Sequence, residues 1–217
     1  MDVLRVSNKH RLLKGFDGAG RNVFGELSDY YGEEAASILI LRAREEYERI
    51  LPEIAEIGEK KVLFSQFIIW AGWISALYKA LLCLGEGKEK ALIVIEDSCI
   101  AYLTNHALVL RLFGKMIFTG LFTLVIKNLA AKSLTCGVRR GYLLKFVKGN
   151  GDFNFGFDVV SCPICKLYQQ EGADELLPLF CELDYALAKI GNWTLDRTDT
   201  IAQGKKICNH RFKKPIK

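Results

Sequence analysis

The sequence predicts an α+β protein in which an N-terminal helical layer packs on a C-terminal sheet that also carries one long helix. Apolar residues follow helical spacing up to about residue 140, and apolar and polar residues alternate as in strands from residue 141 onward. The chain has 217 residues, half of them apolar, which suits one domain with a sizeable core. We therefore predict a single domain, 1–217, with about four helices in 1–140 and a strand–strand–helix–strand–strand layer in 141–217. Its sheet is antiparallel or mixed.

The first part of the chain predicts a glycine-rich loop followed by a helix. Residues 15–27 contain four glycines, which favour a flexible loop. No strand precedes them and their spacing differs from the glycine fingerprint of nucleotide-binding loops, so no phosphate site is expected. Residues 33–57 combine apolar spacing of three and four with Glu and Arg pairs at helical range. Pro52 is expected to bend or restart this helix.

Three further helices are predicted at 62–84, 88–112 and 115–133, and the first of them ends at a pair of glycines. A membrane-spanning helix needs about 20 apolar residues, so the apolar run 116–126 is too short. Polar residues and Lys79 interrupt the run 63–85. We predict buried helices and no membrane span, with a lipid-contacting hairpin as the alternative for 63–85.

The C-terminal layer begins with a predicted hairpin. Its strands are expected near 141–148 and 153–161, because "KGNGD" supplies turn residues between them. Pro163 closes the second strand. Residues 174–191 have the apolar stripe of a helix, and strands at 193–204 and 206–214, joined near Gly204, complete the layer.

Charge and cysteine content limit the classes of partner and compartment. The formal net charge of +5 is weak and scattered, which suits anionic small molecules and gives no indication of nucleic acid binding. The first residues lack the apolar core and cleavage site of a secretory signal. Seven cysteines, an odd number in a chain of this size, favour reduced thiols over a disulfide framework. We therefore expect a cytoplasmic protein.

Four cysteines fall in the C-terminal layer, at Cys162, Cys165, Cys181 and Cys208. A Cys-x-x-Cys pair is a half-site for zinc and also a redox dithiol pattern. Zinc would need Cys181 and Cys208 as its second half, and their separation is not the paired spacing of a zinc ribbon. A redox dithiol would need a long helix after it, and 166–174 is too short and polar. We predict no cofactor, with zinc on these four thiols and plain core packing as alternatives.

Three other residues in this layer suit chemistry on a small molecule. Cys181 and Asp184 are three residues apart on one predicted helix face. Arg197 on its predicted strand could bind a carboxylate through two hydrogen bonds, and a surface ion pair is the alternative. His210 could act as an acid or base near neutral pH, and a solvated histidine beside Arg211 is the alternative.

Together these segments resemble the C-terminal signature of the L-2-amino-thiazoline-4-carboxylic acid hydrolase family. The resemblance covers about 55 residues, in "CPICKLYQQEGADELLPLFCELDYALA" and "LDRTDTIAQGKKICNHRF". The matching positions are Cys162, Pro163, Cys165, Cys181, Asp184, Arg197, Thr198, Thr200, Gly204, Cys208, Arg211 and Phe212. Asn209 stands where the family usually has Asp, and His210 where the residue is often apolar. If that Asp is needed for chemistry, this member has lost or changed the reaction.

The resemblance implies hydrolysis of a C–N or C–S bond in a small cyclic amidine or thiazoline carboxylate, the family's name reaction giving N-carbamoyl-cysteine. A thiolate could attack the ring carbon, or Asp184 could activate water. The predicted catalytic residues are Cys181, Asp184 and Cys208, which match the family pattern, and His210, which is added for its own acid–base chemistry. The implied substrate-binding residues are Arg197, Thr198, Thr200, Cys162 and Cys165. A carboxylate-bearing small molecule is thus the expected partner, and a homo-oligomer stays open.

The order of these elements also resembles the 4-vinyl-reductase-type small-molecule-binding domain. Some sensors of that type hold zinc through three ligands, and only Cys208 is retained here, since Arg197 and Thr200 occupy the other two positions. This second resemblance implies a buried pocket for a hydrophobic ligand. A non-enzymatic binding or sensing module is therefore the alternative function.

Overall fold

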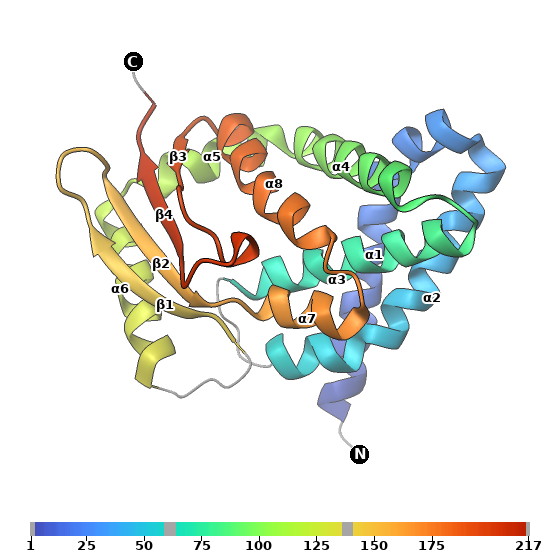
Figure 1. Cartoon of the computed structure of the whole chain (residues 1–217), viewed down its shortest axis with the longest axis horizontal. Helices are drawn as coiled ribbons and strands as arrows, with labels where there is room; N and C mark the ends of the chain where they lie inside the picture. The colour runs from blue at the N-terminus through green and yellow to red at the C-terminus, as the bar shows by residue number, and fades with distance from the viewer. Residues whose placement is uncertain (1–2, 59–63, 136–140, 216–217) are drawn as a thin grey trace. The chain divides into compact units, whose positions relative to one another are not determined.

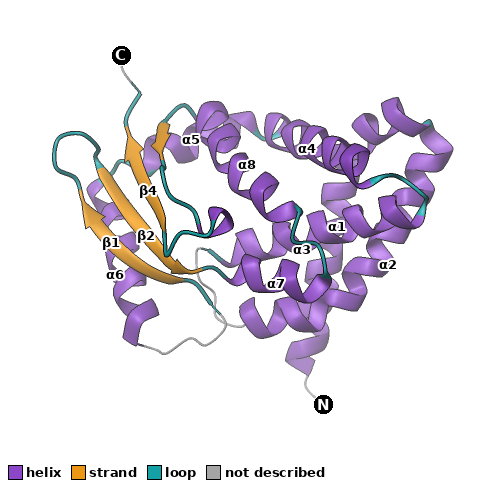
Figure 2. Cartoon of the chain, in the orientation of Figure 1, coloured by secondary structure: helices purple, strands orange, loops and turns teal. Residues whose placement is uncertain are grey.

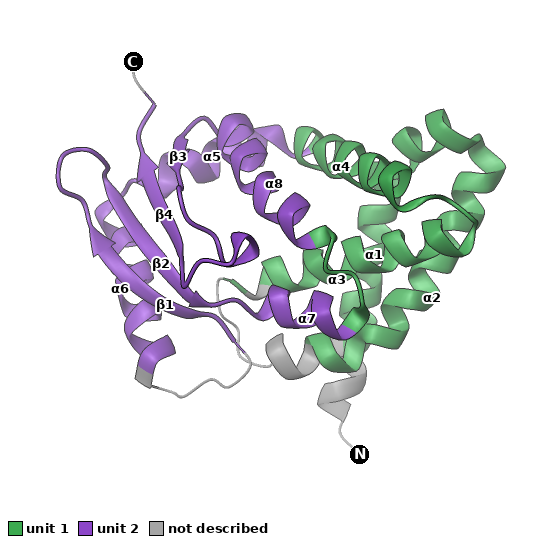
Figure 3. Ribbon diagram, in the orientation of Figure 1, with its two compact units in different colours: residues 1–105, 171–176 green, residues 106–170, 177–217 purple. Residues whose placement is uncertain are grey.

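The computed structural model describes residues 3–58, 64–135 and 141–215 (Figure 1). The chain divides into two compact units, one of residues 1–105 and 171–176 and the other of residues 106–170 and 177–217 (Figure 3). The α+β prediction is confirmed, because the described residues form mainly N-terminal helices and a four-stranded C-terminal sheet. That 1–217 is a single domain stays a prediction.

Four helices build the first unit: α1 (Val3–Tyr31), α2 (Glu33–Gly58), α3 (Ser65–Cys83) and α4 (Lys88–Asn105). Helix α2 packs against α1 and α3, and α4 packs against the same two helices. Tyr47 of α2 is fully buried and stacks on Phe16 of α1, with ring centroids 5.0 Å apart, and the edge of Trp73 of α3 also contacts it. Aromatic packing of this kind adds to the burial of apolar area that holds the unit together.

The glycine-rich loop predicted at 15–27 is wrong, because these residues lie inside α1. Phe16 and Leu27 are buried in the unit's core. A Cβ atom at Gly20 would lie 3.1 Å from the side chain of Ile40 on α2. A larger residue here would press on Ile40 by a few tenths of an ångström, so the close approach of the two helices favours glycine despite its low helix propensity.

The helix predicted at 33–57 is confirmed as α2, which continues through Pro52 to Gly58 rather than restarting. The described part of the helix predicted at 62–84 is confirmed as α3, and positions 62–63 lie outside the described residues. The single helix predicted at 88–112 is wrong. It divides at His106, whose φ of −105° and ψ of 13° are not helical, into α4 and α5 (Ala107–Met116).

Helix α3 contains a segment, Gln66–Cys83, that is long and apolar enough to cross a membrane by length and composition. Half of this segment is buried within the structure, and core helices of soluble proteins pass the same test. The absence of a membrane span therefore stays a prediction.

The second unit contains α5, α6 (Gly120–Thr135), β1 (Leu143–Lys148), β2 (Phe155–Ser161), most of α7 (Pro163–Glu171) and of α8 (Leu176–Gly191), β3 (Thr194–Asp196) and β4 (Cys208–Lys213). The helix predicted at 115–133 thus begins later, at Gly120. The strands form one antiparallel sheet in the order β1-β2-β4-β3 (Figure 2). This confirms the hairpin of β1 and β2 and the helix predicted at 174–191.

One face of the sheet is aromatic and the other is polar. The register pairs Phe155 with Phe212 and Phe157 with His210, so these four side chains share a face. The ring of Phe155 contacts Phe122 of α6, which lies against this face. The alternate positions on the other face carry an ion pair between Asp158 and Arg211, 2.8 Å apart. The sheet therefore has one helix-covered face and one partly solvated face.

Two elements of the C-terminal layer differ from the prediction. No helix was predicted between the second strand and residue 174, and 166–174 was judged too short and polar for the long helix of a redox dithiol, but Pro163–Glu171 form helix α7, with Pro163 at its first position. The strand predicted at 193–204 is confirmed only for Thr194–Asp196. A loop and a short 3-10 helix, Ile201–Gln203, follow it, because the Thr200 hydroxyl accepts a hydrogen bond from the Gln203 N–H and Gly204 adopts a φ of 78°.

Candidate thiol and carboxylate site

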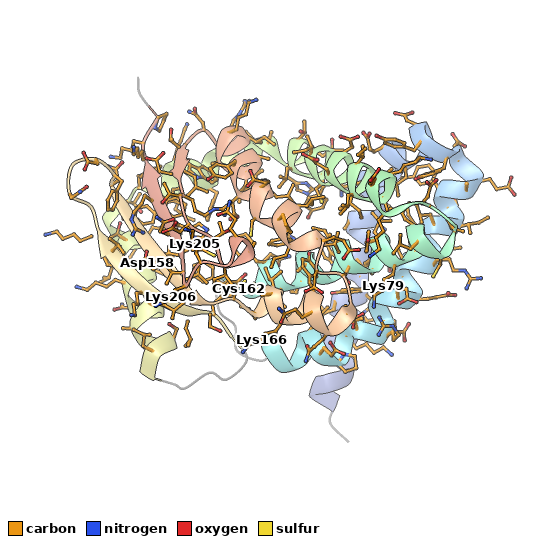
Figure 4. All side chains as sticks on the ribbon, viewed as in Figure 1. Lys79, Asp158, Cys162, Lys166, Lys205 and Lys206 are labelled. Carbon is orange, nitrogen blue, oxygen red and sulfur yellow. The ribbon has the colours of Figure 1, made fainter. Side chains whose placement is uncertain are left out.

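The four C-terminal thiols come from three segments of the second unit. Cys162 lies between β2 and α7, as labelled in Figure 4, and Cys165 lies in the first turn of α7. Cys181 lies on α8 and Cys208 begins β4. A negative charge on Cys162 or Cys208 would raise the pKa of Cys181, so the structure brings these thiols into electrostatic range of one another.

Cys162 and Cys165 form a hydrogen-bonded pair. The hydrogen bond from the Cys162 thiol lowers the pKa of Cys165 and outweighs the opposing effect of burial. The same hydrogen bond, together with burial, raises the pKa of Cys162 well above its usual value. Because α7 begins at Pro163, the pair also lies at the N-terminus of a helix, where a thiolate is favoured.

Cys181 and Cys208 lie in surroundings that favour the protonated thiol. Burial, and then the nearby Asp184 carboxylate, raise the pKa of Cys181 to about 12. Burial also raises the pKa of Cys208, whose Sγ accepts a hydrogen bond from the Ile201 N–H at 3.2 Å. Neither sulfur is therefore a ready nucleophile near neutral pH.

Arg197 and Asp184 form the most buried ion pair of this region. The Arg197 side chain is only 1% exposed, and its Nη1 donates to Asp184 Oδ2 at 2.6 Å. Its Nη2 donates to the Cys181 backbone oxygen at 2.8 Å. Burial alone would lower the pKa of Arg197, but Asp184 raises it above its usual value. The guanidinium is therefore held as a cation against α8.

Arg197 lies in the loop after β3 rather than on a strand, so the predicted strand alternation of Arg197 and Asp199 is wrong. Tyr185 of α8 fixes this loop in two ways. Its hydroxyl donates to the Arg197 backbone oxygen at 2.9 Å, and its ring lies 4.9 Å from the guanidinium carbon. Together these contacts aim the Arg197 side chain at α8.

His210 is buried on β4 beside the same carboxylate. Its Nε2 lies 3.3 Å from Asp184 Oδ2, and its Nδ1 lies 3.3 Å from the Cys208 backbone oxygen. Its ring stacks on Phe157 with centroids 4.9 Å apart. Asp184 thus touches both Arg197 and His210, and its side chain stays 28% exposed.

The chain matches the family model of L-2-amino-thiazoline-4-carboxylic acid hydrolase over residues 66–212. The match covers more than half of the chain and includes every residue of this site. The chain belongs to this family. No curated protein and no solved structure matches it.

In this member of the hydrolase family, Asn209 has a structural role. Its Oδ1 accepts hydrogen bonds from the backbone N–H groups of Thr198 and Asp199, at 3.0 and 2.8 Å, and its Nδ2 donates to the Thr198 hydroxyl at 2.8 Å. An aspartate could accept the same two N–H bonds. The family's usual Asp is therefore compatible with the same turn. Thr200, also predicted to bind substrate, is buried and caps the 3-10 helix.

Sequence reasoning missed two tyrosines at this family site. Tyr142 precedes β1, and burial, followed by the charges of Cys162 and Asp184, raises its pKa well above the usual value. Tyr185 is the residue that aims Arg197. The chemical pattern of the sequence gave no signal for either, because both act through contacts with distant segments.

Among residues 3–58, 64–135 and 141–215, no group of three or more His, Cys, Asp or Glu side chains could hold a metal ion. The alternative of zinc on the four thiols therefore has no support from their arrangement. Elemental analysis of the purified protein tests it directly.

Proposed function

We propose that this protein hydrolyses a small heterocyclic carboxylate of the 2-amino-thiazoline type at the site around Asp184. One observation carries the proposal: a partly exposed carboxylate is held by a buried arginine and touched by a histidine, in a member of this hydrolase family. Groups of this kind suit general acid–base chemistry on water.

The proposed reaction adds one water molecule to the ring carbon between nitrogen and sulfur. The water oxygen bonds to this carbon and becomes a carbonyl oxygen, and the bond from carbon to sulfur breaks. Sulfur leaves with one of the two water protons as a thiol, and the ring nitrogen takes the other. The product is an N-carbamoyl amino acid that carries a free thiol, and its mass equals that of substrate plus water.

Asp184 and His210 are the groups proposed to hold the water and accept its proton. Their Oδ2 and Nε2 atoms are 3.3 Å apart, so one water could reach both. Arg197 acts as a positioning residue for Asp184. Its Nε is buried and has no hydrogen-bond partner among the described atoms, so it is not open to a substrate carboxylate.

A thiol nucleophile is the competing mechanism within the same function. The contacts of the four thiols favour Cys165 over Cys181 and Cys208, because the Cys162 hydrogen bond stabilises its thiolate. Cys165→Ser would abolish turnover in that mechanism, whereas water attack at Asp184 would survive it in part.

The direct test is to incubate the purified protein with L-2-amino-thiazoline-4-carboxylate and to detect the product by mass spectrometry. We expect turnover in the wild type and a loss of at least a hundredfold, roughly the usual contribution of acid–base catalysis, in Asp184→Asn. Cys83→Ser, at an exposed thiol on α3, is the matched control and should leave turnover unchanged. The absence of product at high protein concentration would overturn the proposal.

A binding module without turnover is the second candidate. It is favoured by the burial that keeps Cys181 and Cys208 protonated. It predicts a carboxylate-bearing or apolar ligand that co-purifies with the protein and that Cys181→Ala still binds. In either function the proposed location is the cytoplasm, where thiols stay reduced.

A further inference from the structure

Helices α5 and α6 expose large apolar side chains that the unit's own core does not use. The most exposed are Leu121 at 74%, Leu108 at 73%, Val109 at 61% and Leu112 at 58%. We call the exposed set the α5–α6 apolar face; its members are Leu108, Val109, Leu112, Met116, Leu121, Leu124, Val125 and Leu134. Single exposed leucines are ordinary, but eight large apolar side chains on two consecutive helices indicate a binding surface.

Other residues on or next to the same helices already fill the core of the second unit. Phe113 of α5 packs its ring edge against Trp193, and Phe122 of α6 packs against Phe155 of the sheet. Ile117 and Ile126 are also buried. Each helix therefore carries apolar residues on two sides, a pattern that a helix on a fully solvated surface does not need.

The stretch of sequence that carries this face has only basic charged residues. The sequence has no Asp or Glu between Asp97 and Asp152. The same stretch holds eight basic residues: Arg111, Lys115, Lys127, Lys132, Arg139, Arg140, Lys145 and Lys148. Since eight exceeds the formal net charge of +5, the rest of the chain is net negative. The positive charge is therefore concentrated rather than scattered, which corrects the expectation from overall composition.

Four of these basic residues, Arg111, Lys115, Lys127 and Lys132, are exposed on the two helices that carry the apolar side chains. Arg111 and Lys115 lie one helical turn apart on α5, between the exposed leucines, and Lys127 lies on α6. Basic side chains next to exposed leucine and valine are typical of helices that lie in the headgroup region of a membrane.

We propose that the α5–α6 apolar face docks on a membrane surface that contains anionic lipids, with both helices lying in the interface. The two helices have 10 and 16 residues, and a spanning helix needs about 20. Leucine and valine side chains would enter the boundary between headgroups and acyl chains, and Arg111, Lys115 and Lys127 would bind phosphate or carboxylate groups of the lipids.

Two other occupants fit the charges less well. A second copy of the chain would bring two acid-free basic surfaces together, which costs free energy. Nucleic acid would match the positive charge and would leave the leucines in contact with water. A membrane with anionic lipids satisfies both the apolar side chains and the charge.

The test is sedimentation of the full chain with vesicles of phosphatidylcholine alone and of equimolar phosphatidylcholine and phosphatidylserine. We expect binding to the anionic vesicles that weakens as salt is raised, and much weaker binding to the neutral ones. Replacing three charges by Arg111→Gln, Lys115→Gln and Lys127→Gln should weaken binding on the order of a hundredfold at low salt. Leu108→Ser, Leu112→Ser and Leu121→Ser together should weaken it by at least about tenfold.

Matched control variants test whether vesicle binding depends on the α5–α6 apolar face or only on the overall charge and exposed apolar area of the protein. Lys14→Gln, Lys205→Gln and Lys206→Gln remove three exposed charges outside the acid-free stretch, and Leu41→Ser with Ile93→Ser removes exposed apolar side chains of the first unit. Both sets should bind vesicles like the wild type. Circular dichroism and thermal unfolding should confirm that every variant folds.

Several results would overturn the proposal. These are no binding to anionic vesicles, equal binding to neutral and anionic vesicles, and equal losses in the test and control variants. Self-association without vesicle binding, lost in the same leucine variants, would assign the face to a second copy instead. Turnover of the thiazoline substrate is independent of all these outcomes, because no residue of the face belongs to the site around Asp184.

Discussion

The Arg197 guanidinium lies between the Asp184 carboxylate, 2.6 Å away, and the Cys181 backbone oxygen, 2.8 Å away. Both partners belong to α8, three residues apart. Since the Arg197 side chain is 1% exposed, its charge depends on these partners rather than on water. The pair therefore joins the loop after β3 to α8 and fixes the one carboxylate that the proposed chemistry uses.

Arg197→Met should destabilise the protein by about 2–4 kcal/mol, because it removes the buried cation that pairs with the partly exposed Asp184 carboxylate and the hydrogen bond to the Cys181 backbone oxygen. Urea unfolding followed by circular dichroism measures this change. Lys205→Met, at an exposed position of the loop before β4, is the control and should change the free energy of unfolding by less than about 0.5 kcal/mol. A loss below about 1 kcal/mol for Arg197→Met would contradict the buried ion pair.

Asn209→Asp should keep most of the stability and the turnover of the wild type, because an aspartate oxygen can accept the same N–H bonds from Thr198 and Asp199. Asn209→Ala leaves those donors without their partner and should cost about 1–2 kcal/mol. Thermal unfolding of both variants, with turnover measured alongside, makes the comparison. If Asn209→Asp alone raised turnover many-fold, the position would belong to the chemistry instead of the turn.

Cys165 should react with iodoacetamide at lower pH than the reference thiol N-acetylcysteine. The hydrogen bond from Cys162 lowers the pKa of Cys165, so its reactive thiolate is present at a pH where an ordinary thiol is still protonated. Alkylation across a pH series, followed by peptide mass spectrometry, gives the midpoint. Cys181, with its pKa raised to about 12, should stay unmodified near neutral pH.

Cys162→Ala tests the cause of this reactivity, because it removes the hydrogen bond to Cys165, whereas the hydroxyl of Cys162→Ser could still donate one. In Cys162→Ala the midpoint of Cys165 alkylation should move to higher pH. An unchanged midpoint in Cys162→Ala would show that the hydrogen bond does not set the reactivity of Cys165.

Much of the fold followed from periodicity. The hairpin of β1 and β2 and helices α2 and α8 have long apolar patterns, and the structure confirms each of them. The first part of helix α1 was not predicted, because its four glycines favour a loop in the sequence and only one of them, Gly20, lies in a tight contact with a second helix. Helix α7 was not predicted, because it has only nine residues and many of them are polar. Its first turn carries Cys165, and the contacts of that turn could not be read from the sequence.

The candidate site was predictable as a set of residues but not as a set of contacts. The spacing of Cys181 and Asp184 indicated one helix face, and both lie on α8. The partner of Arg197 could not be predicted, because the predicted strand at 193–204 placed Arg197 in the wrong local structure. The difference in pKa between Cys165 and Cys181 could not be predicted either, because it depends on one hydrogen bond and on burial.

Glu171 in the first unit should make stability fall at acid pH. Its side chain is 2% exposed and bonds to Arg49 and Lys79, which together lower its pKa although burial opposes them. Because the pKa of Glu171 is lower in the folded state, its contribution to stability is complete above the pKa of the unfolded chain, about 4.3, and is lost as pH falls through the folded value.

Glu171→Gln should therefore cost about 1–3 kcal/mol at neutral pH, and the difference from wild type should shrink below about pH 4. Urea unfolding across pH measures it. The control Glu45→Gln, in an exposed pair with Arg42, should change neither the stability nor its pH dependence, and a pH-independent difference for Glu171→Gln would refute the role of its charge.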